Sequence, residues 1–207
     1  ITSPVFSQDR PLLLRVGISG TGTYDEGLWH FKTDQGLEPQ IFKFDNSWGI
    51  AMDIDYHLKE KWTAGVHLSF AVTGFQLTID NFNIRTISKV NTSHNQLIGE
   101  VKYVARPGKA FRPFVGANAG VLLTWDIQLI ISGQNIDFKF INPFIYGMVI
   151  GFDYEIGSKG WAVHSVIRGQ TFEYTTEETS VTNRQRLLEQ VWWMNYNHLQ
   201  FGISKRF

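Results

Sequence analysis

Hydrophobic and polar residues alternate one by one along several stretches of this chain, most regularly between Ser47 and Leu58. Every second residue there is apolar: Trp48, Ile50, Met52, Ile54, Tyr56 and Leu58. A helix would scatter these side chains around its axis, whereas a strand places successive side chains on opposite faces, so the period of two predicts a β-strand. Similar alternation is found at 12–24, 65–72, 97–106, 114–125, 144–155, 161–170 and from about 191 to the end.

The connections between these stretches alternate between short and long. Tight turns are expected at 59–61, 107–109 and 157–160, and long polar loops at 25–44, 75–91, 126–139 and 173–190. Short turns at one end and long loops at the other are typical of transmembrane β-barrels, whose strands each cross the bilayer with about 9–11 residues. The sequence therefore predicts an all-β fold, an eight-stranded antiparallel up-and-down transmembrane β-barrel over residues 12–207, preceded by an N-terminal arm over residues 1–11.

The last stretch of the chain carries the most specific pattern. Its apolar residues alternate up to the final position: Leu199, Phe201, Ile203 and Phe207. A strand that ends on an aromatic residue resembles the closing strand of bacterial outer-membrane β-barrels, although an apolar residue is commoner at the position of Lys205. The whole chain resembles the superfamily of small eight-stranded outer-membrane barrels that includes the OmpA-like transmembrane domain and the porin-family barrels of Bacteroidota, and residues 112–120 are similar to its fifth strand.

This resemblance implies a protein of the bacterial outer membrane. Both termini and the short turns would lie in the periplasm, and the long loops would lie outside the cell. The implied partners are outer-membrane lipids and lipopolysaccharide, together with other outer-membrane or periplasmic subunits where the barrel belongs to an assembly. The family includes structural barrels, adhesion proteins, and accessory subunits of secretion or surface-assembly machines.

Aromatic residues are expected at the two boundaries between lipid and water, because amphipathic rings favour those interfaces. The expected interface residues are Tyr56, Trp62, Tyr154, Trp161 and Phe207 beside the short turns, and Trp48, Trp125, Trp192 and Trp193 beside the long loops. Basic residues also gather beside the short turns, where they can pair with lipid phosphates. The alternative is a soluble β-core, which would not need two aromatic bands.

Composition narrows the class of protein further. The 207 residues include no cysteine, which excludes disulfides, a thiol nucleophile and cysteine-based metal sites. The 19 acidic and 19 basic residues balance, so net charge predicts no nucleic-acid partner. The six histidines lack the spacing of metal ligands, and no metal or other cofactor is expected.

If the apolar face of each strand meets lipid, the opposite face fills the barrel. The ionisable residues expected in this lumen are Arg15, Asp53, Asp55, His57, His67, Glu100, Lys102, Asp153, Glu155, His164, Arg168 and His198. Side chains just fill an eight-stranded barrel, and buried charges must be paired. Turn geometry sets Asp53 opposite His67. It also sets Asp153 opposite His164, so the sequence predicts a closed polar network and no open pore.

The leading functional hypothesis is a non-catalytic scaffold or anchor in an envelope, secretion or surface-assembly complex, because loops on rigid scaffolds often carry function. The preferred contact site is the loop before the last strand, with Glu177, Glu178, Arg184 and Arg186. A mobile, solvated loop is the alternative interpretation of that segment. A porin-like barrel that binds a small solute or lipid would need a less filled lumen. A soluble lipocalin-like barrel would bury carboxylates against an apolar ligand, which is costly.

An outer-membrane lipid-modifying hydrolase is a further alternative. Asp53, His67 and Ser69 are expected close together, which resembles a hydrolase triad. The spacing of His67 and Ser69 is similar to the His-x-Ser motif of outer-membrane lipid A deacylases. Those enzymes carry an asparagine after the serine, whereas Phe70 follows here, and their site faces lipid rather than a lumen. The sequence therefore favours a protein that is not an enzyme.

Overall fold

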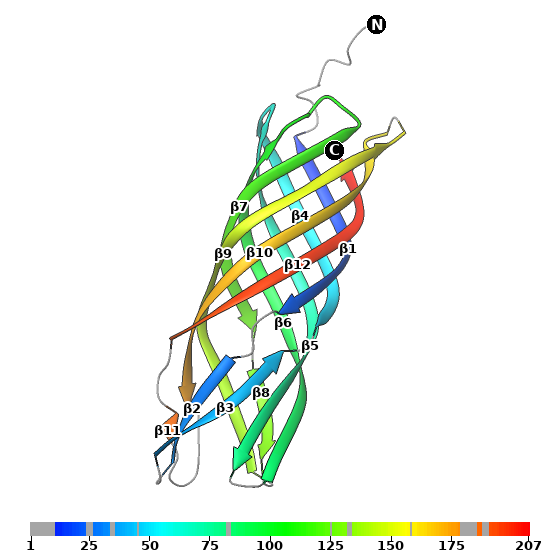
Figure 1. The fold of residues 1–207 in the computed structure, drawn as a ribbon. Helices are drawn as coiled ribbons and strands as arrows, with labels where there is room; N and C mark the ends of the chain where they lie inside the picture. Colours follow the sequence, from blue (N-terminus) through cyan, green and yellow to red (C-terminus); the bar gives the residue numbers. More distant parts are fainter. Residues whose placement is uncertain are drawn as a thin grey trace, which may run out of the picture.

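Long strands form the wall of a closed barrel in the computed structural model, which describes residues 11–23, 27–33, 36–44, 46–81, 84–124, 126–131, 134–157, 159–178, 186–187 and 191–207. The eight barrel strands in this part of the chain are β1 (Leu12–Thr23), β4 (Ser47–Lys59), β5 (Trp62–Asn81), β6 (Ile84–Val104), β7 (Phe111–Thr124), β9 (Gln134–Ile156), β10 (Trp161–Glu178) and β12 (Val191–Arg206). Each pairs antiparallel with the barrel strands before and after it, and β1 pairs with β12 to close the cylinder (Figure 1). The predicted eight-stranded antiparallel barrel is confirmed.

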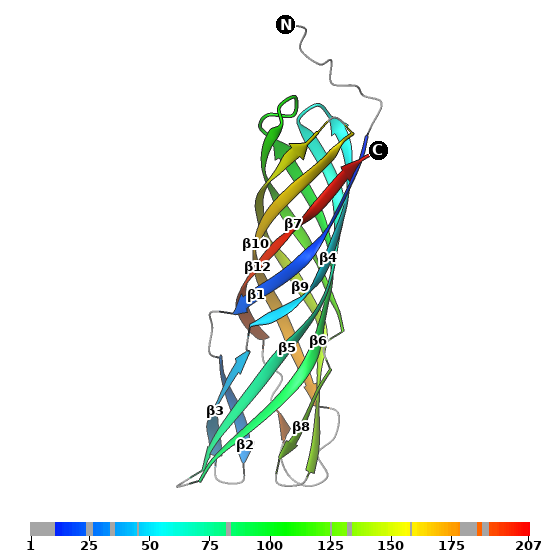
Figure 2. The same ribbon diagram turned by 90° about the vertical axis from the view of Figure 1, so that its right-hand side faces the viewer.

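The strands continue beyond the barrel as arms, at the end opposite the short turns (Figures 1 and 2). Four short strands belong to these arms: β2 (Gly27–Thr33), β3 (Gly36–Phe44), β8 (Asp126–Ile131) and β11 (Arg186–Leu187). β2 pairs with β3 and β11, β3 pairs with β5, and β8 pairs with β9. β5 and β6 stay paired, without a register shift, as far as Asn81 and Ile84. None of the described residues forms a helix that is long and apolar enough to cross a membrane.

These arms correct the prediction of long polar loops at 25–44, 75–91 and 126–139. Residues 75–81 and 84–91 pair with each other as strands, so most of one predicted loop is a hairpin extension. Backbone groups outside a membrane still gain from ladder hydrogen bonds, but both faces of such a strand can meet water. In the sequence, Phe75, Leu77 and Ile79 nevertheless continue the alternation of β5, whereas residues 84–91 do not alternate.

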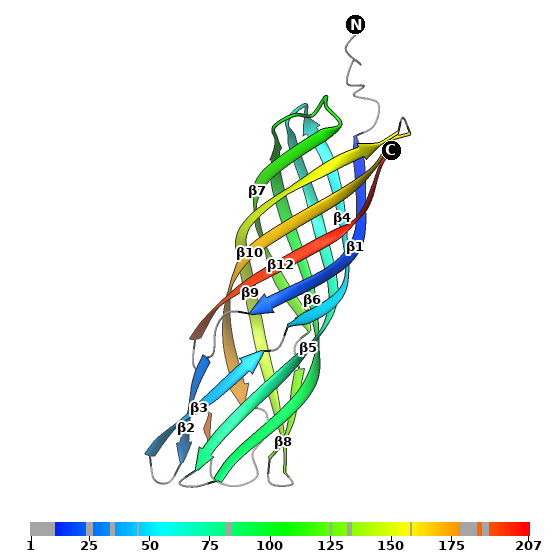
Figure 3. The same ribbon diagram turned by 45° about the vertical axis from the view of Figure 1, so that its right-hand side comes forward.

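The first and last barrel strands meet at the end of the short turns. The backbone N–H of Phe207 donates to the carbonyl of Leu12 at 2.9 Å. The turns that join β4 to β5, β6 to β7 and β9 to β10 lie at this same end (Figures 1 and 3). In the turn after β9, Gly157 and Gly160 have φ angles of 72° and 75°, a left-handed conformation that favours glycine.

The two faces of the wall differ in chemistry. Along β4 from Ser47 to Tyr56, inward side chains are buried or half-buried, and outward side chains are exposed except Met52, which is half-buried. Outward residues such as Ile18 and Met148 are 72% and 66% exposed. The lumen also contains buried apolar side chains, so it is not filled by polar groups alone: Leu13, Ile98, Val104, Phe114, Leu122, Ile145, Val149 and Val166.

Inward-facing glycines bring neighbouring strands close together. Gly17 and Gly202 lie opposite each other on β1 and β12. A Cβ added to Gly17 would stand 2.2 Å from the carbonyl oxygen of Phe201, and one added to Gly202 would stand 2.0 Å from that of Val16. Both distances are far inside van der Waals contact. Hydrogen is thus the only side chain that fits at this closing seam.

Candidate functional site

Buried charged side chains join several strands across the lumen. Arg15 on β1 donates from Nε and Nη2 to the two carboxylate oxygens of Asp153 on β9, at 2.9 and 2.8 Å. Its Nη1 donates to Asp55 on β4. Lys102 on β6 donates to both oxygens of Asp55 at 3.0 Å and approaches Glu100 Oε2 at 2.7 Å. One connected series of ion pairs therefore links β9, β1, β4 and β6.

Arg168 on β10 extends the same series. Its Nε donates to Glu100 Oε1 at 2.6 Å, its Nη2 to Asp53 Oδ1 at 2.6 Å, and its Nη1 to Gln200 Oε1 at 2.8 Å. His67 Nδ1 on β5 lies 2.6 Å from the same Asp53 oxygen. Together with Gln200 on β12, this connected series of ion pairs and hydrogen bonds reaches seven of the eight barrel strands.

We call this the charge network, and it has eight ionisable members: Arg15, Asp53, Asp55, His67, Glu100, Lys102, Asp153 and Arg168. None of them is more than 3% exposed. Charges removed from water remain stable only when ion pairs and hydrogen bonds replace the lost hydration. These groups bind one another across the lumen, from different sides of the cylinder.

The other predicted lumen residues also lie on the inward face but outside this series. Glu155 accepts a hydrogen bond from Arg112 Nη1 at 2.5 Å. The Nε2 atoms of His164 and Gln200 are 3.2 Å apart. The ring centroids of His198 and His67 are 5.1 Å apart, and His57 is only partly buried.

Both predicted strand registers hold, but only one gives the expected contact. Asp53 is opposite His67, and their side chains are hydrogen-bonded. Asp153 is opposite His164, yet Asp153 binds Arg15 instead. Turn geometry identifies facing residues on neighbouring strands, whereas a long arginine side chain can reach across the lumen to a more distant strand. No local signal in the sequence identifies such a partner.

Arg112 is a further lumen residue that the predicted set of inward charges does not include. It is 3% exposed and faces inward. The signal that identifies it is its spacing of two and six from the inward residues Phe114 and Asn118 on β7.

Some buried polar atoms have no hydrogen-bond partner among the described residues. They include Ser19 Oγ and the side-chain amides of Asn118 and Gln170. Asn118 and Gln170 flank Gly147 on neighbouring strands. Asn118 is opposite Glu100 of the ion-pair series, and Gln170 lies two residues beyond Arg168 on β10.

The outer wall has the chemistry of a surface that meets lipid. Exposed aromatic side chains lie near the short turns, as predicted: Tyr56, Trp62, Tyr154, Trp161 and Phe207. Trp48 is 77% exposed near the opposite end of its strand. Trp125 lies outside the described residues, as do the side chains of Trp192 and Trp193 on β12. A wide exposed apolar surface of this kind marks an interaction with a membrane or another protein.

The predicted contact loop is only partly described. Glu177 and Glu178 lie on β10, opposite Lys139 and Phe138 of β9, and Arg186 lies on β11. Arg184 lies outside the described residues. Part of this segment is therefore strand rather than loop.

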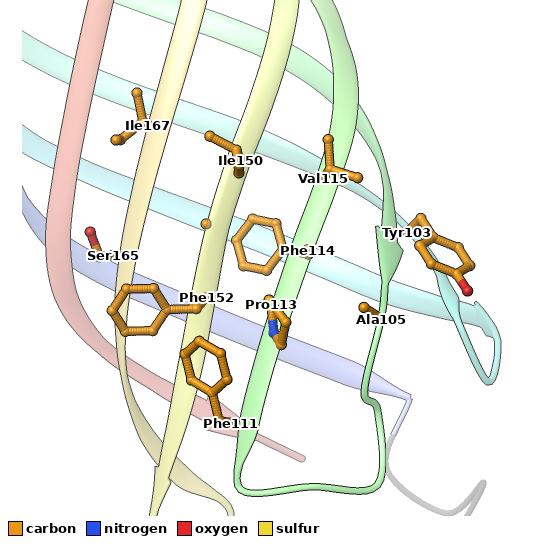
Figure 4. Close-up of a pocket in the computed structure, with 11 residues that line it drawn as sticks. Tyr103, Ala105, Phe111, Pro113, Phe114, Val115, Ile150, Phe152, Ser165 and Ile167 are labelled. Carbon is orange, nitrogen blue, oxygen red and sulfur yellow. The ribbon is translucent and has the colours of Figure 1, made fainter.

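An apolar groove of about 410 Å³ indents the outer wall between β6 and β10 (Figure 4). Its lining residues are Tyr103, Ala105, Phe111, Pro113, Phe114, Val115, Ile150, Gly151, Phe152, Ser165 and Ile167. Only Tyr103 and Ser165 among these carry polar side chains. The groove starts next to the turn between β6 and β7.

The residues of the suggested triad do not form a charge-relay series. Asp53 and His67 are hydrogen-bonded, and Ser69 is buried at 2% exposure. His67 Nε2, the atom that would activate a serine, has no partner among the described residues. Within the same part of the chain, no group of three or more His, Asp or Glu side chains is arranged to hold a metal ion.

The sequence matches no family model and no curated protein. The barrel, however, is similar to solved structures. It matches the outer membrane protein OprG from Pseudomonas aeruginosa with a TM-score of 0.68 and 13% identity, over 96% of each chain. This chain has the fold of a small outer-membrane β-barrel.

Two further matches have the same character. The outer membrane protein AlkL, solved in lipid bilayers, gives a TM-score of 0.69 and 17% identity, over 100% of this chain and 96% of that one. Outer Membrane Protein W of E. coli matches with a TM-score of 0.47 and 16% identity, over 97% of this chain and 100% of that one. At these identities the neighbours show the fold alone, and an outer-membrane location and an OmpA-like or Bacteroidota relationship stay predictions.

Proposed function

We propose that this chain is an integral protein of the bacterial outer membrane, with its termini and short turns in the periplasm. The exposed apolar wall supports this placement, since large apolar side chains such as Ile18, Ile50 and Met148 would otherwise meet water. The exposed aromatic residues near the short turns fit a lipid–water boundary. The fold shared with outer-membrane barrels is consistent with it.

Within that membrane the barrel acts as a non-catalytic scaffold or anchor. The observation that carries this proposal is the charge network, whose buried ion pairs and hydrogen bonds together reach seven strands across the lumen and support an obstructed axis. A barrel filled in this way offers its arms and its outer wall for contact with other envelope components. Glu177, Glu178 and Arg186 remain the proposed contact residues on the arms.

Ion conductance across a planar lipid bilayer tests the obstructed lumen. The native protein is expected to insert without opening a steady conductance. The double variant Glu100→Ala with Lys102→Ala removes two network side chains and is expected to leak ions. The matched variant Lys59→Ala with Lys61→Ala changes only exposed turn residues and should stay closed. A steady conductance from the native protein would contradict the obstructed lumen.

Extraction in mild detergent tests the scaffold role itself. Native-size analysis and mass spectrometry should find defined companions migrating with the barrel. Glu177→Lys with Glu178→Lys is expected to release a companion bound at the arms, whereas Lys59→Glu with Lys61→Glu at the opposite end should retain it. A native protein that migrates alone at 23.7 kDa would contradict a scaffold.

Passage of a small solute is the second candidate function. The side-chain amides of Asn118 and Gln170 favour it, because they have no hydrogen-bond partner in the described part of the chain and such groups can bind a neutral polar molecule or water. Swelling of protein-loaded liposomes in solutions of small neutral solutes tests this candidate. Swelling that Asn118→Leu reduces, without a change in the folded fraction, would favour passage over the scaffold.

A further inference from the structure

Small residues line part of the apolar groove. Ala105, Pro113, Gly151 and Ser165 contribute little or no side-chain volume on four neighbouring strand segments. Figure 4 shows Pro113 and Phe114 between the flanking rings of Phe111 and Phe152 on one side and Tyr103 on the other.

Aromatic contacts define the two sides of the groove. The rings of Phe111 and Phe152 lie 5.4 Å apart between centroids. On the other side, Tyr103 makes an edge-to-face contact with Trp62 at 5.3 Å. Because each pair joins side chains on adjacent strands, the sides are held apart by the barrel itself.

Phe114 forms the floor and separates the groove from the charge network. Its side chain is 3% exposed. The guanidinium carbon of Arg15 lies 4.9 Å from the centre of the ring, and Lys102 Nζ lies 5.5 Å from it. The groove thus ends at an aromatic ring that cations contact within the lumen. The groove is therefore suited to a ligand that binds on the outer wall and does not enter the lumen.

The chemistry along the groove changes from apolar to cationic toward the short turn. Ile150 and Ile167 line the part nearer the middle of the wall. At the turn end, Arg106 follows the lining residue Ala105 directly, and Lys109 precedes Phe111 by two positions. Both basic side chains are exposed. This order matches an amphiphile with a hydrocarbon chain and an anionic headgroup.

A second protein fits the groove less well than a lipid does. A stable protein interface buries about 1,200–2,000 Å² in total. A groove of about 410 Å³ has room for a narrow chain and not for a helix. Cationic residues beside an apolar surface at the membrane boundary attract anionic lipid headgroups.

We infer that this groove retains one acyl chain of an anionic glycerophospholipid from the leaflet at the short turns, with the headgroup phosphate bound by Arg106 and Lys109. The inference rests on the proposed membrane location. A chain seated in the groove contacts the wall on several sides, whereas a chain on the smooth wall contacts it on one. The retained lipid should therefore remain after the surrounding lipid is removed.

Native mass spectrometry of the barrel, after reconstitution in phosphatidylethanolamine vesicles containing phosphatidylglycerol, tests the acyl-chain site. The native protein is expected to retain one phosphatidylglycerol molecule through detergent exchange. Ser165→Leu adds bulk to the β10 side of the groove and should lower retention about tenfold, equivalent to roughly 1.4 kcal/mol. Ala117→Leu adds the same bulk to the wall of β7 outside the groove and should leave retention unchanged.

A second pair of variants tests the headgroup contact. Arg106→Gln with Lys109→Gln should abolish the preference for phosphatidylglycerol over phosphatidylethanolamine. Lys59→Gln with Lys61→Gln removes two positive charges from another short turn and should preserve that preference. Loss of the preference in both double variants would overturn the assigned headgroup site.

The acyl-chain site is overturned if the native protein retains no lipid, or if Ser165→Leu and Ala117→Leu retain equal amounts. Failure of the membrane proposal gives a different result. In that case the native protein and every control variant would be absent from the outer-membrane fraction of cells and would not insert into vesicles.

Discussion

Replacing Arg168 by methionine tests whether the charge network stabilises the barrel. Arg168 is fully buried and donates hydrogen bonds at 2.6 Å to both Glu100 and Asp53. A methionine side chain can extend into the same part of the lumen, but it has no hydrogen-bond donor and no charge. Two buried carboxylates then lose a shared cation, although Lys102 still approaches Glu100 and His67 still contacts Asp53.

Removing one partner of a buried ion pair costs about 3–5 kcal/mol of folding free energy. Because both carboxylates keep another partner, we expect Arg168→Met to lose about 3 kcal/mol, at the lower end of that range. Arg168→Lys keeps the charge but loses the forked geometry of the guanidinium, so its loss should be smaller. The exposed Lys61→Met should change the free energy by less than about 1 kcal/mol.

Urea unfolding in phospholipid vesicles, followed by tryptophan fluorescence, measures these differences. Adding Glu100→Gln to Arg168→Met should recover part of the loss, because it removes one of the uncompensated charges. Interacting residues typically show coupling energies of about 0.5–3 kcal/mol. If Arg168→Met and Lys61→Met unfold at the same urea concentration, the charge network does not stabilise the barrel.

Three other results follow from the structure. Gly17→Ala should reduce the folded fraction seen by heat-modifiable gel migration, whereas Gly20→Ala, whose added Cβ would be 3.7 Å from its nearest neighbour, should not. A membrane-impermeant maleimide should label Ser88→Cys on intact cells and Lys109→Cys only after permeabilisation; the opposite pattern would reverse the proposed orientation. The purified protein should release no fatty acid from outer-membrane lipids, and release that Ser69→Ala abolishes would contradict a non-catalytic role.

The membrane-crossing part of the fold could be predicted from the sequence because lipid imposes a strict rule on it. Trp48, Ile50, Met52 and Ile54 face outward and the residues that alternate with them face inward, which gives the period of two. The same rule, with the short turns, gave the register that sets Asp53 opposite His67. Local alternation and turn length carry this information in full.

The arms and the detailed pairing could not be predicted in the same way. Residues 84–91 form a strand without such alternation, whereas Phe75, Leu77 and Ile79 on β5 do alternate with polar residues and extend the period of two beyond the predicted strand. The partners of Arg15 depend on which strands curve within reach of its side chain across the lumen. The groove near Ser165 likewise depends on small residues from strands that are distant in sequence.

The paired length of β5 and β6 has a consequence for where a partner can dock. β5 contains 20 residues, which at a rise of about 3.3 Å each gives a rod of roughly 66 Å. One crossing of the bilayer uses about half of that length. The remainder of β5 forms an extended hairpin with β6, and the two strands stay paired by backbone hydrogen bonds as far as its tip. A partner at the tip would therefore be held clear of the lipid surface, at a height fixed by strand length.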